Sequence, residues 1–238
     1  VYGMAKSIMS YYMLRSKRTF VCDILILTNP FILDKMIYLE PRKFYLPHPI
    51  DTDRFSPAEI EEYDDRILIW AKLERIKGID VAFEAAKLLP EYQFDAIFVG
   101  EDRLYYKARK PSNVTLLQRK QLEEIPEFIN RYALVLGQFC LGAFGHSELE
   151  AMSCGKPVVS YWNRDYDAFY RTACPILSSN HANDIAQLVK SNLGNKRLGE
   201  KNRKWVLENH SASKVAGSLI KIYESVIRRR VQAKRLCC

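Results

Sequence analysis

No apolar run in the sequence approaches the roughly 20 residues that a helix needs to cross a bilayer. The first residues also lack the succession of basic, apolar and small-residue zones that marks a secretory signal. Internal repeats and low-complexity tracts are absent as well. With 48% hydrophobic and 27% charged residues, the composition is that of an ordinary globular protein. We therefore expect a soluble protein in the cytoplasm.

Patterns that bind metals or form disulfide frameworks are also missing. The six cysteines include no Cys-x-x-Cys pair, and the four histidines show no paired ligand spacing. The triplets Asp51-Thr52-Asp53 and Asp165-Tyr166-Asp167 have the Asp-x-Asp form that holds a metal in some enzymes. Because so short a pattern recurs by chance, we interpret neither triplet as a site. The sequence predicts reduced thiols, no metal and no cofactor.

Charge of one sign is in excess. The chain carries 36 basic and 28 acidic residues, a formal net charge of +8. This excess favours anionic partners, which include phosphates, nucleic acids and acidic lipids. No recognition-helix or aromatic-platform pattern accompanies the basic residues, so we do not expect a nucleic-acid partner.

Short apolar runs alternate with amphipathic stretches along most of the chain. The first 46 residues follow the order helix, strand, helix, strand. A proline-rich and charged segment at 47–65 interrupts the alternation and is typical of an interdomain linker. Residues 66–211 then alternate regularly, and an amphipathic helix with a basic tail fills 212–238. Continuously apolar strands predict an α/β fold with a doubly wound parallel sheet. The expected strands are 66–71, 94–100, 113–117, 133–137, 156–162 and 175–178, and the expected helices are 78–90, 122–131, one from about Ser147, 182–193, 202–210 and 212–234.

In such a sheet, ligands bind beyond the carboxyl ends of the strands. After the strand 66–71, the segment "AKLERIKGID" places Lys72, Arg75 and Lys77 just before a helix. Cations beside the free amides of a helix N-terminus form an anion site, and phosphate is the obvious anion. The alternative is a solvated surface loop.

After the strand 133–137, the segment "QFCLGAFGHSELEAM" leads into another helix. Gly142 and Gly145 allow a ligand to approach the backbone closely. Glu150 has two interpretations: it closes a capping box with Ser147, or it accepts hydrogen bonds from two adjacent hydroxyls of a sugar. His146 is either part of a ligand site or a loop residue that packs on Phe144.

Three segments together resemble the C-terminal half of the group 1 glycosyltransferases (family 4), which are retaining enzymes of GT-B architecture. These segments are "LPHPIDTDRFSP", "AKLERIKGID" and "GAFGHSELEAMSCGKPVV". The resemblance implies that Lys72 and Lys77 bind the leaving diphosphate and that Glu150 holds the ribose. The remaining positions that it assigns to the donor site are Gly142, Phe144, Gly145, His146, Ser147, Gln118 and Arg119.

The chain departs from the family pattern in three respects. Gly142 stands where the family has a sugar-contacting glutamate, so the donor sugar is not identified. Lys72 replaces an arginine. The positive charge is kept, but a lysine lacks the planar guanidinium that binds a phosphate through two hydrogen bonds. Only about 46 residues precede the linker, so the resemblance implies that residues 1–46 are a remnant of the N-terminal GT-B domain. A fragment, a truncated product and one half of a two-chain enzyme are the alternatives.

The resemblance implies metal-independent transfer of a hexosyl group from a UDP- or GDP-linked sugar to a hydroxyl acceptor, with retained configuration. The acceptor is a glycan, a lipid-linked molecule or a small molecule. The alternative hypothesis is a non-catalytic nucleotide-sugar-binding module that needs a partner chain. The terminal helix either packs on residues 1–46 or lies on an anionic membrane face.

Overall fold

The computed structural model describes residues 24–30, 32, 42–59 and 63–236. The chain forms two compact units, one of residues 1–47 with 213–238 and the other of residues 48–212. In the first unit, β1 (Ile24–Leu27) pairs in parallel with β2 (Arg42–Tyr45), which confirms both strands expected there. Of the two helices expected within the first 46 residues, the first falls outside the described residues and the second falls mostly outside them. The long helix α9 (Ala212–Leu236) agrees with the expected terminal helix.

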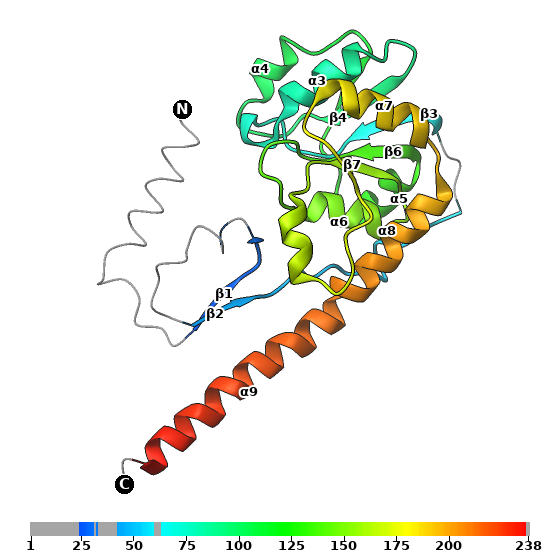
Figure 1. Cartoon of the computed structure of the whole chain (residues 1–238). Coiled ribbons are helices and arrows are strands. Elements are labelled where there is room, and N and C mark those ends of the chain that lie inside the picture. Colours follow the sequence, from blue (N-terminus) through cyan, green and yellow to red (C-terminus); the bar gives the residue numbers. More distant parts are fainter. Residues whose placement is uncertain (1–23, 31, 33–41, 60–62, 237–238) are drawn as a thin grey trace. The chain divides into compact units, whose positions relative to one another are not determined.

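The second unit is built on a six-stranded parallel sheet in the order β5-β4-β3-β6-β7-β8. The chain moves outward from β3 through β4 to β5, returns to β6 beside β3, and then proceeds the other way (Figure 1). The strands are β3 (Tyr63–Ile69), β4 (Gln93–Ile97), β5 (Val114–Leu117), β6 (Tyr132–Leu136), β7 (Val158–Ser160) and β8 (Leu177–Ser178). The strand order reverses between β3 and β6, the place where doubly wound sheets bind ligands. The expected fold class is confirmed.

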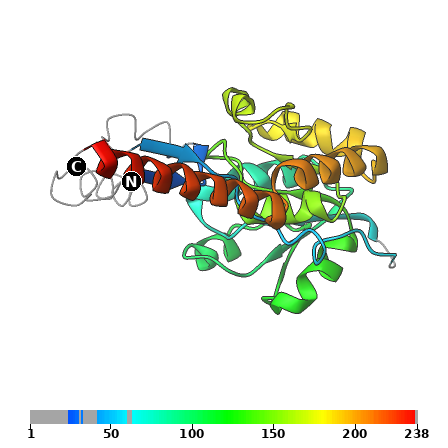
Figure 2. The same ribbon diagram turned by 90° about the horizontal axis from the view of Figure 1, so that it is seen from below.

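Helices cover both faces of this sheet. In Figure 1, α3 and α7 lie above it, and α5, α6 and α8 lie below; α8, coloured orange, faces the viewer in Figure 2. Contacts between α3 and α7 and between α6 and α8 join each group. All five residues of β6 are buried, as expected for a strand between two helical layers. The helices are α3 (Ile79–Lys87), α4 (Arg103–Lys107), α5 (Ile125–Asn130), α6 (His146–Ser153), α7 (Ala182–Asn192) and α8 (Lys196–Asn209), with 3₁₀ turns η1 (Arg75–Lys77), η2 (Leu122–Glu124) and η3 (Arg164–Phe169).

The helix α8 begins earlier than the sequence predicts, at Lys196 instead of residue 202. Asn195 caps it, because its side-chain oxygen accepts from the Leu198 N–H at 3.1 Å. The sequence did not indicate this start, because Gly199 lies within the helix and glycine has a low helix propensity. A Cβ at Gly199 would lie 1.8 Å from the carbonyl oxygen of Gly155, so only glycine allows this close approach. The short elements α4 and η3 were not expected either.

Residues 48–59, which the sequence assigns to a linker, belong to the sheet unit. Ile50 forms a parallel bridge with Ser211. The Phe55 carbonyl accepts from the Ser153 hydroxyl at 2.5 Å and from Arg203 at 3.1 Å. The segment is therefore held against α6 and α8. Strand β3 also starts at residue 63, inside the range assigned to the linker.

None of the helices in the described part of the chain combines the length and the apolar character needed to cross a membrane. The predictions of a cytoplasmic location and of contact with an anionic membrane stay predictions.

His210 should make stability depend on pH. Its Nδ1 lies 2.9 Å from the His48 carbonyl, which only accepts, so this nitrogen carries the proton. Burial lowers the pKa of His210 to about 4, whereas an unfolded chain takes up this proton near 6.5. Because the unfolded state then binds more protons, the free energy of unfolding should fall by about 3 kcal/mol as the pH falls from about 6.5 to about 4.

Urea titrations at several pH values in this window measure the slope. His210→Asn keeps an N–H for the carbonyl but does not titrate, so it should flatten the slope. An unchanged slope in this variant would contradict the assignment.

Candidate functional site

The loops that follow β3 and β6 are bonded to each other at the point where the strand order reverses. The Trp70 N–H donates to the Leu136 carbonyl at 2.8 Å, and the Phe139 N–H donates to the Lys77 carbonyl at 2.8 Å. The Lys77 ammonium donates to the side-chain oxygen of Gln138 at 3.1 Å. The predicted cation Lys77 therefore lies at the ligand-binding crevice of the sheet.

Glu148 shapes the loop between β6 and α6. Its side chain is 2% exposed and accepts two backbone hydrogen bonds, from Gln138 at 2.8 Å and from Gly145 at 3.0 Å. The capping box of α6 is therefore formed by Gly145 and Glu148, and the first interpretation of Glu150, a capping box with Ser147, is wrong. Helix α6 begins at His146, so its third residue, from which a carboxylate reaches back, is Glu148. The signal in the sequence was a glutamate three residues after Gly145.

Glu150 points elsewhere. Its Oε2 accepts from the indole N–H of Trp70 at 3.3 Å, so the carboxylate faces the end of β3. Burial raises the pKa of Glu150, while the Trp70 hydrogen bond and nearby His146 act in the opposite direction. This arrangement is compatible with the second interpretation of Glu150, a carboxylate that accepts hydrogen bonds from a ligand.

A cavity of about 340 Å³ opens beside these residues at the carboxyl ends of β3, β4 and β5. It brings together Lys72, Arg119 and Ser147, three predicted site residues from separate loops. Trp70 and Lys120 also line it and were missed, because nothing in their local sequence marks them. The other lining residues are Ala71, Ile97, Val99, Leu122 and Ile125. Gln118 is exposed and does not line this cavity.

The remaining predicted residues, which belong to the segment from Gly142 to His146, do not line this cavity. Gly142 has a φ of 65°, and a Cβ there would lie 2.9 Å from the Tyr161 ring, so the position requires glycine. The side chain of Phe144 is buried and stacks on Trp162 with ring centroids 4.1 Å apart. The ring of His146 lies 4.6 Å from that of His48. The Gly145 N–H is used by Glu148, which leaves later amides of α6 for a ligand.

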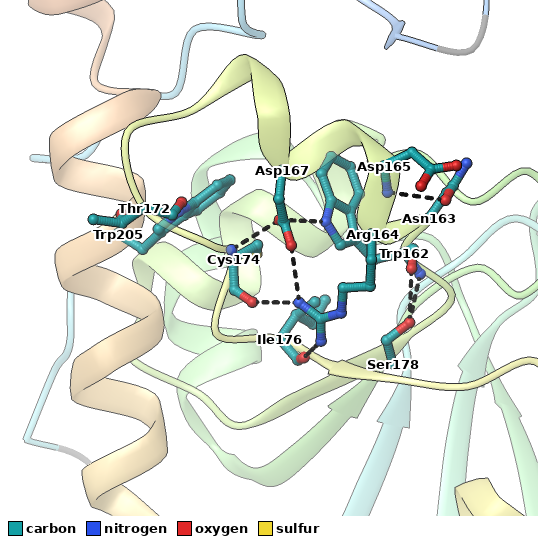
Figure 3. A network of polar contacts seen from close by, with 10 residues as sticks. All are labelled: Trp162, Asn163, Arg164, Asp165, Asp167, Thr172, Cys174, Ile176, Ser178 and Trp205. Atoms are coloured by element: carbon teal, nitrogen blue, oxygen red, sulfur yellow. Dashed lines mark hydrogen bonds and ion pairs between the residues drawn. The ribbon is translucent and has the colours of Figure 1, made fainter.

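A network of polar contacts fixes the loop after β7 (Figure 3). The Asp167 carboxylate accepts from the Trp162 indole at 2.9 Å and from the Cys174 N–H at 3.0 Å, and it pairs with Arg164 at 3.6 Å. Arg164 also donates to two carbonyls of the following segment. Asp167, from the second Asp-x-Asp triplet, therefore fixes the loop that contains Trp162, the residue on which Phe144 stacks.

Residues 51–205 match the family model of the glycosyl transferases group 1. This range includes most of the segment 47–65, the loops that follow β3 and β6, and most of α8. The chain belongs to this family. The match includes every predicted site residue. The resemblance seen in the sequence is thereby confirmed at the level of the group 1 family.

Solved glycosyltransferase structures share the fold. Sucrose-phosphate synthase from Thermosynechococcus elongatus superposes with a TM-score of 0.71 at 16% identity, over 95% of this chain and 62% of that one. Anabaena Alr3699/HepE in complex with UDP and glucose gives 0.69 at 13% identity, over 86% and 63%. An uncharacterised glycosyltransferase of Methanocaldococcus jannaschii, MJ1178, is 28% identical over 90 residues, which are 35% of this chain and 25% of that protein. The chain thus spans less than two thirds of each of these relatives.

Replacing Glu148 by alanine should destabilise the domain. Two backbone N–H groups would lose their acceptor, and each buried unpaired group costs about 1–3 kcal/mol, so we expect a loss of roughly 2–5 kcal/mol in the free energy of unfolding. Glu148→Gln keeps one acceptor oxygen, so its free energy of unfolding should lie between those of the wild-type chain and Glu148→Ala. Urea denaturation measures both.

The matched control is Glu123→Ala at an exposed position of η2, which should change stability by less than about 0.5 kcal/mol. A Glu148→Ala variant as stable as this control would refute the role of Glu148.

Proposed function

We propose that the chain is the donor-binding part of a glycosyltransferase and that it binds a UDP- or GDP-linked sugar at the crevice between β3 and β6. The observation that carries this proposal is that Lys72 and Ser147, the second residue of α6, line one cavity at the carboxyl edge of the sheet. Lys77 does not line this cavity, but it follows Lys72 in the same loop and donates to Gln138 in the loop after β6. Related structures support the ligand class, since Alr3699/HepE is described in complex with UDP-glucose.

The proposed reaction transfers the glycosyl group to a hydroxyl acceptor with retained configuration. As the glycosidic bond breaks, negative charge grows on the leaving diphosphate. The ammonium groups of Lys72 and Lys77 and the free amides of α6 would stabilise this charge, without a metal ion. Preformed donors of this kind lower a barrier by a few kcal/mol each. In this role Glu150 accepts hydrogen bonds from the ribose hydroxyls, and Arg119 borders the base.

A second candidate is a donor-binding module that turns over only with a partner chain. Transfer assays with and without candidate partner chains separate the two. Glycosyl transfer by the chain alone, continuing in excess EDTA, would support the metal-independent enzyme.

Calorimetric titration with UDP, GDP, ADP and their common sugars tests the site. We expect micromolar binding of one nucleotide. Lys77→Ala should weaken it by about tenfold or more, because a hydrogen bond to a charged group is worth about 1.5–3 kcal/mol. Lys72→Ala should act in the same direction.

Lys87→Ala is the matched control, because this lysine of α3 is exposed and pairs with Glu84 on the same helix. Equal nucleotide affinities in the Lys77→Ala and Lys87→Ala variants would contradict the proposal that Lys77 binds the diphosphate. Unchanged melting temperatures establish that the variants are folded.

A further inference from the structure

Trp70 stands at the carboxyl end of β3 and is held in place from two sides. Its backbone N–H donates to the Leu136 carbonyl at 2.8 Å, which ties it to β6. Its ring packs at 50° against that of Phe128, with centroids 6.0 Å apart. An indole has two side-chain torsions, so these contacts leave its N–H aimed in one direction.

That N–H donates to Glu150, which comes from a different element 80 positions along the chain. The Glu150 side chain has three rotatable bonds and is only partly buried, so packing alone does not set its orientation. An indole N–H is a donor only, and it therefore binds the carboxylate without competing for the hydroxyl protons of a ligand. The hydrogen bond is made to Oε2, and a carboxylate has further acceptor positions on both oxygens.

Trp70 also lines the cavity that contains Lys72 and Ser147. One side chain thus forms part of the wall of the candidate site and orients the carboxylate beside it. The charged groups that affect the pKa of Glu150 are His146 and Glu148 of its own helix and Arg54 of the segment 47–65. None of these replaces the directional hydrogen bond from the indole.

We propose that Trp70 is a positioning residue that holds the Glu150 carboxylate in the orientation that accepts both ribose hydroxyls of the nucleotide, and that it thereby sets the preference for ribonucleotides over 2′-deoxyribonucleotides. The inference rests on the proposed function, because it requires nucleotide binding at this crevice. Beyond that function, the inference assigns a role to Trp70, which acts through Glu150, and a preference for ribonucleotides that can be measured.

The test compares the affinities for UDP and 2′-deoxy-UDP, and for GDP and 2′-deoxy-GDP, by calorimetry. Trp70→Phe keeps a ring in the wall and removes the N–H. We expect the wild-type chain to prefer the ribonucleotide by about tenfold, as the loss of one charge-assisted hydrogen bond predicts. Trp70→Phe should reduce this ratio to about threefold or less while leaving the affinity for the deoxynucleotide nearly unchanged.

Further variants sharpen the result. Trp70→His, which restores a ring N–H, should recover part of the ratio. If Trp70→Phe does not fold, Trp70→Leu replaces it, because leucine also lacks the N–H. In a Glu150→Ala background, which has no acceptor for the indole, Trp70→Phe should have no additional effect on the ratio, because both changes remove one contact. Trp205→Phe is the matched control: it loses an indole hydrogen bond to the Thr172 carbonyl, 3.1 Å long, and should keep the wild-type ratio (Figure 3).

Equal weakening of both nucleotides by Trp70→Phe, or an unchanged ratio, would overturn the inference and leave the proposed function intact. If the wild-type chain binds none of the four nucleotides, the proposed function fails and the inference fails with it.

Discussion

The contact between the loops after β3 and β6 organises the candidate site. Lys77 takes part twice, since its carbonyl accepts from Phe139 and its ammonium reaches Gln138. A Cβ at Gly78, whose φ is 69°, would approach Phe139 to 3.0 Å, so glycine is needed for the two loops to meet. The strand order reverses at this point, which is where doubly wound sheets bind ligands.

Two carboxylates on α6 show how one short helix divides its functions. Glu148 and Glu150 are two positions apart, so they project from different sides of the helix. Glu148 faces inward and binds the backbone of the preceding loop. Glu150 faces the end of β3 and meets Trp70. The first carboxylate determines the shape of the loop, and the second is left at the edge of the cavity.

The side of the site next to β7 is built on aromatic packing. Phe144 stacks on Trp162, and Trp162 is in turn bonded to Asp167. Tyr161, one residue before Trp162, occupies the space beside Gly142. Any side chain at position 142 would collide with this ring. The loop after β7 therefore requires glycine at position 142.

Local patterns were sufficient for much of the fold. Apolar runs and amphipathic stretches located the six strands of the sheet and most of the helices, because a strand between two helical layers is apolar along its whole length and the helices that cover it are apolar on one face only. Loop position then placed Lys72 and Lys77 at the carboxyl edge. The start of α8 was misjudged, since the contact that makes Gly199 acceptable in a helix comes from Gly155, far away in sequence.

The sequence by itself determined the parallel α/β architecture, and it placed Lys72 and Lys77 at the edge where such sheets bind ligands. Only the tertiary structure decided which glutamate caps α6, because moving the N-cap by two residues, from Ser147 to Gly145, changes the capping glutamate from Glu150 to Glu148. It also decided that Trp70 meets Glu150. Such pairs depend on which strand ends and helices become neighbours in the folded sheet, and no local spacing records that.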